Sequence, residues 1–204
     1  MKWIKRILLV VLVLTPAALI LFAILTLGLY TIGSSSMEPA ILVGDRIVVR
    51  VVKDATPKRG EMFVFRRKDG LFIQRVVAVA GDRVRIHDKK LFVNGQEQRE
   101  PYVTQMDSSR MSARDDFPAE PLEGLVRDAE WIRFVKASVA AGEVVVPAGS
   151  SFALGDSRDN SLDSRFLGFY RNDTILAKPV MVLYSQATTH SDKEFRWERL
   201  FKAL

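Results

Sequence analysis

A long uncharged stretch near the N-terminus constrains the fold of this chain more than any other feature. Residues 7–30 contain no Asp, Glu, Lys or Arg, and almost all of them are apolar. At about 1.5 Å of rise per residue, an α-helix of this length crosses a hydrocarbon core of about 30 Å. Pro16 would kink such a helix, which membrane spans tolerate. The run therefore predicts a membrane anchor covering residues 1–30 and a separate domain over residues 31–204.

The charges around the apolar run predict its orientation. Lys2, Lys5 and Arg6 precede it, so the positive-inside rule places the N-terminus in the cytoplasm and the following domain outside. A cleaved signal peptide is the alternative, but its apolar region would span about 7–15 residues and end in a small-x-small site. The longer run favours an uncleaved anchor, and no second run of spanning length follows.

Composition narrows the classes of function. The formal net charge is +6 and the isoelectric point about 9.7, but the basic residues are scattered between candidate strands. We therefore expect a surface facing anionic membrane lipid rather than a nucleic-acid interface. The absence of cysteine excludes disulfides, thiolate chemistry and cysteine-based zinc sites. His87 and His190 are the two histidines of the sequence, too few for a site with several histidine ligands. A histidine-centred triad is also disfavoured, and we expect neither metal nor cofactor.

From residue 46 onward the pattern is typical of β-strands. β-Branched and alternating segments are separated by turn-forming residues, and residues 68–70 predict a hairpin between two of them. We therefore expect a mainly β extracytoplasmic domain, an antiparallel sheet or partial barrel behind a single transmembrane helix. The expected strands cover residues 46–52, 61–66, 71–80, 82–86, 90–93, 144–146, 151–154 and 175–183.

Two segments depart from this pattern. The stretch from Tyr102 to Lys136 is polar and weakly periodic, which indicates an insertion on the β core over roughly residues 102–140. The tail over residues 193–204 is amphipathic, and Trp197 and Phe201 are spaced to share one face of a helix. We expect this tail to pack on the core or to lie at the membrane surface.

Two motifs carry residues with catalytic chemistry. Residues 33–45 read GSSSMEPAILVGD, which places three serines, a methionine and a proline directly after the apolar run. Serines behind a membrane helix are usually a polar linker, so it is the order of residues that sets this segment apart. Residues 155–168 read GDSRDNSLDSRFLG. Asp, Asn and Ser favour turns, but this order of charges is more specific than a turn requires.

Together with residues 72–82, FIQRVVAVAGD, these motifs resemble type I signal peptidases. The resemblance covers the anchor and about residues 30–90 and 140–185. It implies a serine endopeptidase of the bacterial cytoplasmic membrane that removes N-terminal signal peptides from exported preproteins. Cleavage would follow small residues in an Ala-x-Ala-like pattern. The implied partners are signal peptides and membrane lipid, without nucleic acid.

The resemblance also assigns roles to individual residues. It makes Ser36 the nucleophile, and it makes the Ser34 hydroxyl a partner of the Ser36 amide in the oxyanion hole. It makes Ser161 the residue that orients the lysine base, and it makes Asp163 and Arg165 an ion pair that braces the site. The residues matching the substrate pockets are Ile32, Met37, Phe72 and Ile73.

Gln74 stands where the family carries its lysine base. A lysine buried beside apolar residues such as Ile73 and Val76 loses its charge more easily and can then accept the serine proton. A glutamine amide cannot take up a proton near neutral pH, so we expect impaired turnover. Leu162 is also larger than the small residue often found at its position, and we expect it to narrow or reshape the substrate groove.

Three explanations for Gln74 remain open: an engineered inactivation, a natural inactive paralogue, or a different amine acting as the base. The candidate amines are Lys53, Lys58, Lys68 and Lys178, and none has apolar flanks that would lower its pKa. The leading function is signal-peptide cleavage. The alternatives are a specialised pilin-maturation peptidase and a non-catalytic protein that binds signal peptides.

Overall fold

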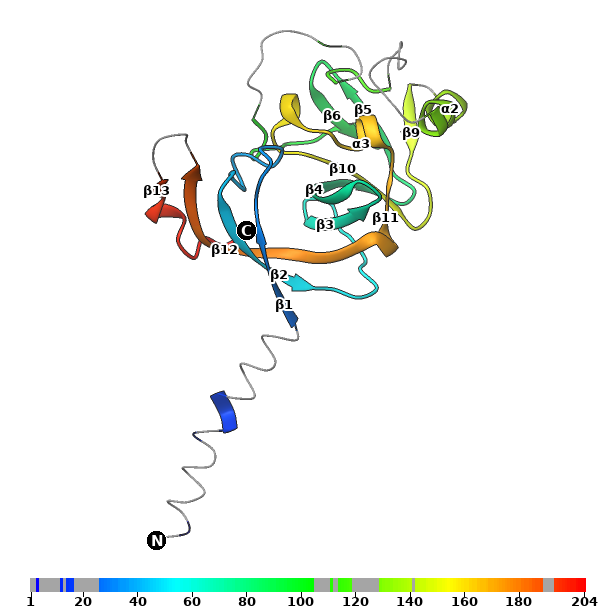
Figure 1. Ribbon diagram of the computed structural model, residues 1–204. Helices are drawn as coiled ribbons and strands as arrows, with labels where there is room; N and C mark the ends of the chain where they lie inside the picture. Colours follow the sequence, from blue (N-terminus) through cyan, green and yellow to red (C-terminus); the bar gives the residue numbers. More distant parts are fainter. Residues whose placement is uncertain are drawn as a thin grey trace.

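The computed structural model describes residues 3, 12, 14–16, 26–104, 111, 114–118, 129–140, 142–188 and 193–204. Most of the predicted membrane anchor lies outside these residues. Within the described residues, no helix is both long and apolar enough to cross a membrane. The end of the apolar run differs from the prediction, because Leu27–Thr31 forms strand β1 instead of helix. In Figure 1, β1 lies beside β2 at the lower end of the body.

The body is mainly antiparallel β-sheet, as predicted. The larger sheet has the order β1-β2-β12-β3-β4-β10-β11, with β13 paired to β12, and all its pairs are antiparallel. Strand β12 is the longest strand among the described residues and joins β2 to β3 (Figure 1). The bounds are β2 Asp45–Val51, β3 Met62–Arg67, β4 Gly70–Val79, β10 Ser150–Leu154, β11 Tyr170–Arg171, β12 Ile175–Thr188 and β13 Lys193–Phe195.

A smaller antiparallel sheet has the order β7-β6-β5-β9-β8. Its strands are β5 Arg83–His87, β6 Lys90–Val93, β7 Gln96–Glu97, β8 Val139–Ala140 and β9 Glu143–Val145. Helix α2, Ala129–Ser138, lies in the predicted insertion and buries Trp131 in the same apolar cluster as Phe117 and Phe152. Short helices complete the fold: α3 Ser164–Leu167, η1 Arg158–Asn160, η2 Asn172–Thr174 and η3 Trp197–Arg199.

The hairpin of β3 and β4 positions the central part of the candidate site. Its strands pair from Met62 opposite Arg75 to Arg67 opposite Gly70, which confirms the predicted hairpin and its turn. Gly70 has a φ of +140°, a conformation that side chains rarely adopt. Residues Met62 to Phe65 are all buried, and fully burying a side chain such as Phe65 stabilises the fold by about 1.5–3 kcal/mol.

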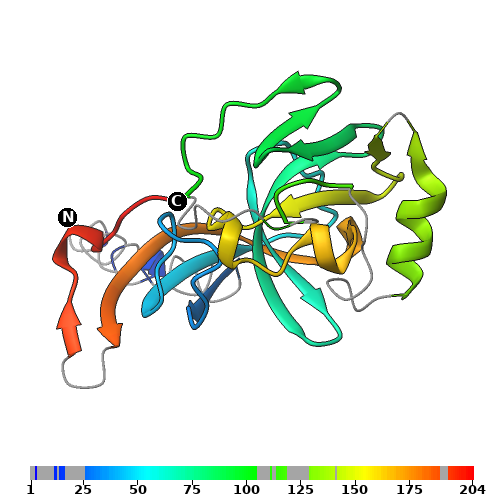
Figure 2. The ribbon, with the colours of Figure 1, turned by 90° about the horizontal axis from the view of Figure 1, so that it is seen from above.

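The C-terminal tail is not the helix that its amphipathic pattern predicted. It forms strand β13 and the single turn η3, and Trp197 and Phe201 are 72% and 61% exposed. The residue that the tail buries is Arg199, whose ion pair with Asp45 fixes the turn. Seen from above, the tail (red) and helix α2 (yellow-green) lie at opposite ends of the body (Figure 2).

Candidate active site

The segment that carries Ser36 is a compact turn between β1 and β2. Ser36 is half-buried, and Met37 next to it is 2% exposed. The Ser36 amide donates to Oγ of Ser34 at 3.3 Å, and the Ser36 carbonyl accepts from the Ser157 amide at 3.0 Å. The structure therefore places both serines together and joins their segment directly to the second sequence motif.

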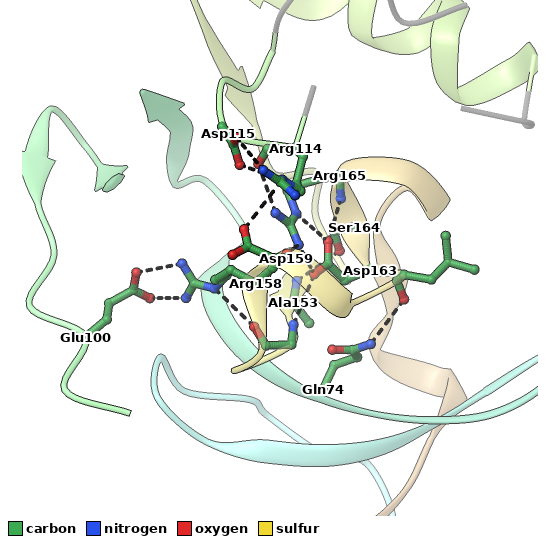
Figure 3. A network of polar contacts seen from close by, with 12 residues as sticks. Gln74, Glu100, Arg114, Asp115, Ala153, Arg158, Asp159, Asp163, Ser164 and Arg165 are labelled. Atoms are coloured by element: carbon green, nitrogen blue, oxygen red, sulfur yellow. Dashed lines mark hydrogen bonds and ion pairs between the residues drawn. The ribbon is translucent and has the colours of Figure 1, made fainter. Parts of the chain in front are cut away.

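Gln74 lies on β4 and is 1% exposed. Its Nε2 donates to the carbonyl of Leu162 at 3.2 Å, as Figure 3 shows. Its Oε1 and the hydroxyl oxygens of Ser161 and Tyr170 are buried and make no hydrogen bond of acceptable geometry. Burial raises the pKa of the Tyr170 hydroxyl, which keeps it neutral, although the Gln74 side chain lies close enough to Tyr170 to lower that pKa slightly. The side chain at the predicted base position is thus a neutral amide with an unmatched acceptor.

Gly155 allows the two motifs to approach each other closely. A Cβ added at this position would lie 2.2 Å from Oγ of Ser161 and 2.5 Å from the carbonyl oxygen of Ser36. Real Cβ atoms essentially never make contacts this short. The absence of a side chain at Gly155 therefore leaves room for both the Ser161 hydroxyl and the Ser36 carbonyl beside it.

The predicted ion pair between Asp163 and Arg165 is present and fully buried (Figure 3). Arg165 donates through Nε and one terminal nitrogen to the two Asp163 oxygens, at 2.9 and 2.8 Å. Its two terminal nitrogens also donate to the backbone carbonyls of Arg114 and Arg158, at 2.9 and 2.7 Å. Asp163 also accepts from the Gly155 amide at 3.1 Å. Four of the five N–H donors of Arg165 are thus bonded, which holds the loop in one geometry.

Sequence reasoning missed a second set of buried charges around this loop. Arg75 binds both oxygens of Asp156 at 2.8 and 2.6 Å, and Arg158 donates to Glu100 at 2.8 Å. Burial raises the pKa of Asp156, although Arg75 acts in the opposite direction. Tyr102 stacks under Arg75, with the guanidinium carbon 4.1 Å from the ring centroid. The Gly-Asp-x-Arg order of the motif was the available signal, but Glu100 lies outside any motif.

Two cavities meet at Ser34, Ser36 and Phe72. The first has a volume of about 200 Å³ and is mostly apolar, and it contains all four predicted pocket residues, Ile32, Met37, Phe72 and Ile73. The second has a volume of about 380 Å³ and is lined by Ser34, Ser36, Phe72, Gln74, Asp159, Asn160, Ser161 and Leu162. The structure thus brings the predicted nucleophile, oxyanion donor, base position and orienting serine to one cavity.

The candidate replacement amines lie elsewhere. Lys53, Lys58 and Lys68 are exposed, and Lys178 donates to Glu61 at 2.7 Å. None of these four lysines lines either cavity. The described residues hold no group of three or more His, Cys, Asp or Glu side chains that could bind a metal ion. The second cavity contains the hydroxyl of the predicted nucleophile, Ser36, but none of these four amines lines it.

Comparisons with known proteins show the family to which the chain belongs. The family profile "Signal peptidase, peptidase S26" matches residues 1–184. Signal peptidase IB of Staphylococcus aureus (strain COL) is 31% identical over 152 residues, which cover 73% of each chain. A probable signal peptidase I-2 of Synechocystis is 29% identical over 157 residues, 72% of this chain and 58% of that protein. The crystal structure of a signal peptidase I from Enterococcus faecalis V583 matches with 25% identity and a TM-score of 0.41, over 62% of this chain and 98% of that chain.

Proposed function

Because the chain belongs to the signal peptidase family, peptidase S26, we propose that it is a membrane-bound serine endopeptidase scaffold for signal-peptide removal. Its turnover is limited by Gln74. The observation that carries this proposal is the convergence of Ser34, Ser36, Gln74 and Ser161 on one cavity beside a second, apolar cavity. The uncharged run before β1 supports an anchor with the peptidase domain outside the cytoplasmic membrane.

In the proposed reaction, Oγ of Ser36 attacks the carbonyl carbon of the scissile peptide bond. The new C–O bond forms as the Ser36 hydroxyl proton passes to a base and negative charge moves to the carbonyl oxygen. The C–N bond then breaks as a proton is delivered to the leaving amine, which releases the mature protein, and water hydrolyses the ester left on Ser36 to free the signal peptide. The Ser36 amide and the Ser34 hydroxyl would stabilise that oxygen, and losing one such donor typically costs about 10²–10³ in rate. The Ser36 amide is bonded to Ser34, so the substrate oxygen has to replace this contact.

The step that this chain lacks is proton uptake from Ser36. Gln74 lines the same cavity as Ser36, but its amide cannot accept a proton near neutral pH. A lysine here would be buried among apolar neighbours, next to the Leu162 carbonyl and facing the same cavity as Ser161. Burial disfavours its charged form, so a neutral amine would be accessible. Gln74 therefore leaves the site assembled and without its base.

The substrate groove follows from the apolar cavity. A cavity of about 200 Å³ holds small side chains, which fits cleavage after Ala-x-Ala-like sequences. A substrate segment in extended conformation would present alternate side chains to the cavity. Leu162 is 51% exposed and lines the second cavity, and we propose that its side chain narrows the substrate groove there.

A non-catalytic function is favoured by one observation, the hydrogen bond that fixes the Gln74 amide to the Leu162 backbone. The neutral amide thus has a defined place in the site, so the groove can hold a signal peptide without cleaving it. The chain would then be a signal-peptide-binding paralogue of an active enzyme.

A preprotein panel separates these functions. The chain, Gln74→Lys and Gln74→Lys with Ser36→Ala are each incubated with several preproteins, and the new N-termini are identified by mass spectrometry. The proposal predicts that Gln74→Lys cleaves several preproteins after small residues and that Ser36→Ala abolishes this. Cleavage of one pilin-like substrate alone would indicate the specialised peptidase. If the chain and Gln74→Lys both bind signal peptides but cleave none, the result would indicate the non-catalytic binding function.

A further inference from the structure

Three Gly-Asp pairs in the chain share one local arrangement. In each, a distant arginine binds both oxygens of the aspartate: Arg199 on Asp45, Arg59 on Asp82, and Arg75 on Asp156. The arginine of the first pair is the most remote in sequence, at 154 positions from its aspartate. It belongs to the C-terminal tail, which follows the part of the chain that the family profile matches.

The tail is bonded to the segment that carries Ser36. Arg199 donates through Nε to Oδ1 of Asp45 at 3.0 Å and through a terminal nitrogen to Oδ2 of Asp45 and to the Ala40 carbonyl, the latter at 3.0 Å. Arg196 donates to the Val43 carbonyl at 3.0 Å. Arg199 and Asp45 are 5% and 0% exposed, so the ion pair between them is shielded from water. Three points between residues 40 and 45 are therefore fixed by the tail.

The end of the tail is itself anchored to the sheet. The Val182 amide donates to the Lys202 carbonyl at 2.8 Å, and the Leu204 amide donates to the Val180 carbonyl at 3.0 Å. Leu204 packs against the apolar cluster that contains Met37, the neighbour of Ser36. The tail thus contacts the nucleophile segment both through the Arg199 bonds and through this cluster.

We infer that Arg199 is a positioning residue for Ser36, acting through Asp45 and Ala40 to fix the turn on which the nucleophile sits. The inference rests on the proposed function, because it names a further residue of that same site. Arg199 does not line either cavity and therefore acts without touching the substrate. Its planar fork is what the geometry requires, and a lysine in its place would keep the charge but lose the paired bonds.

The ionisation of Asp45 is consistent with this arrangement. Burial alone would raise the pKa of its carboxyl, but the hydrogen bonds from Arg199, Ser185 and the Leu42 amide hold it below its ordinary value. The carboxylate therefore stays charged and available to the arginine at neutral pH.

Arg59 provides a matched control for a purely structural role. In both turns the aspartate also accepts from the amide three residues earlier, Leu42 to Asp45 at 2.9 Å and Val79 to Asp82 at 2.8 Å. The turn at Asp82 carries no residue of the candidate site. Loss of either arginine therefore removes two bonds to an aspartate, although the Arg59 side chain is 41% exposed and that of Arg199 only 6%. Only Arg199 is bonded to the segment that carries Ser36.

The test compares Arg199→Lys with Arg59→Lys in the Gln74→Lys background, using steady-state cleavage of a preprotein. We expect Arg199→Lys to lower kcat about 10- to 100-fold, because small misplacement of a reacting group has effects of this size. KM should change less than about twofold, and Arg59→Lys should leave both constants unchanged. An equal fall of kcat in the two variants, or no fall in Arg199→Lys, overturns the inference.

A second measurement needs no turnover. Hydrogen exchange of the amides at residues 37–44 is compared in the chain as written and in its Arg199→Lys and Arg59→Lys variants. Faster exchange in these residues with Arg199→Lys alone supports the positioning role, and unchanged exchange overturns it. If Gln74→Lys cleaves nothing, the proposed function fails, and the exchange result still decides whether Arg199 holds the segment.

Discussion

The loop of Asp163 and Arg165 and the neighbouring position of Gln74 on β4 differ in how many of their buried polar groups have a hydrogen-bond partner. In the buried loop, the Arg165 guanidinium donates to Asp163 and to two backbone carbonyls. Beside that loop, the buried oxygens of Gln74, Ser161 and Tyr170 have no hydrogen-bond partner. A buried polar group without a partner costs about 1–3 kcal/mol, so the second region is the less stable arrangement.

Under the proposed function, this difference indicates where the chain would depart from a working peptidase. The ion pair of Asp163 and Arg165 is bonded to the surrounding backbone. The unmatched oxygens lie on Gln74, Ser161 and Tyr170. The proposal therefore places the defect at Gln74 and not in the loop that surrounds it.

Breaking the brace should have the largest effect on stability. Arg165→Ala leaves the fully buried Asp163 without its cation, and removing one partner of a buried pair typically costs about 3–5 kcal/mol. The free energy of unfolding from denaturant titration measures the loss. The control is Arg171→Ala, which removes an exposed ion pair with Asp173 and should cause little change. Similar small losses in both variants would show that the brace is not structurally important.

Closing the gap at Gly155 should have the next largest effect. Gly155→Ala forces a Cβ into Ser161 and the Ser36 carbonyl, and such overpacking typically costs about 1–3 kcal/mol. Gly33→Ala is the control, because a Cβ at Gly33 meets nothing within 4 Å. Thermal unfolding of both variants checks the prediction. A tolerated Gly155→Ala would mean that the two motifs do not need this close approach.

The sequence predicted the strands of the sheet better than the insertion and the C-terminal tail. The hairpin of β3 and β4 was predictable because its alternation and its turn at residues 68–70 agree. Helix α2 was not predicted, because the insertion around Trp131 has weak periodicity and its helix is fixed by packing against Phe117 and Phe152. The tail was predicted as a helix because its apolar spacing gave no sign that the buried residue would be Arg199.

The site was predicted to the extent that its residues lie in motifs. Ser34, Ser36 and Ser161 share the cavity with Gln74 as the resemblance implied. The contributions of Glu100 and Arg199 were not predictable, because each depends on a pairing between distant segments. Local sequence carries no record of such a partner.

Ser161 and Ser164, from the same sequence motif, test the comparison between bonded and unbonded polar groups at single hydroxyls. Ser164 Oγ accepts from the Ala153 amide at 2.9 Å inside the core, whereas Ser161 Oγ has no partner. Ser164→Ala should therefore cost about 1–3 kcal/mol, because it leaves a buried amide unmatched. Ser161→Ala should cost little or slightly stabilise the chain as written. Denaturant titration of both variants checks this, and an equal loss in the two would contradict the assigned difference.

Acid stability should show a smaller effect. The folded-state pKa of Asp45 lies below its ordinary value of 3.8, so its contribution to stability is present above about pH 4 and is lost as pH falls through the lowered value. Asp156 has the opposite sign, because burial raises its folded-state pKa and its contribution is lost as pH rises through that value. Asp45→Asn should therefore flatten the fall in unfolding free energy below about pH 4. An unchanged acid slope would show that Asp45 is not held by Arg199 in solution.

The most direct test of the central claim is the single-turnover rate of preprotein cleavage by the chain and by Gln74→Lys across a range of pH. If only proton acceptance is missing, Gln74→Lys should be faster by about 10²–10⁴-fold. Its rate should rise with pH through a pKa below the value of about 10.4 for a free lysine, because burial disfavours the charged amine. Gln74→Met, of similar size and without hydrogen bonds, should remain slow. Equal rates for the chain and Gln74→Lys at every pH would contradict the account.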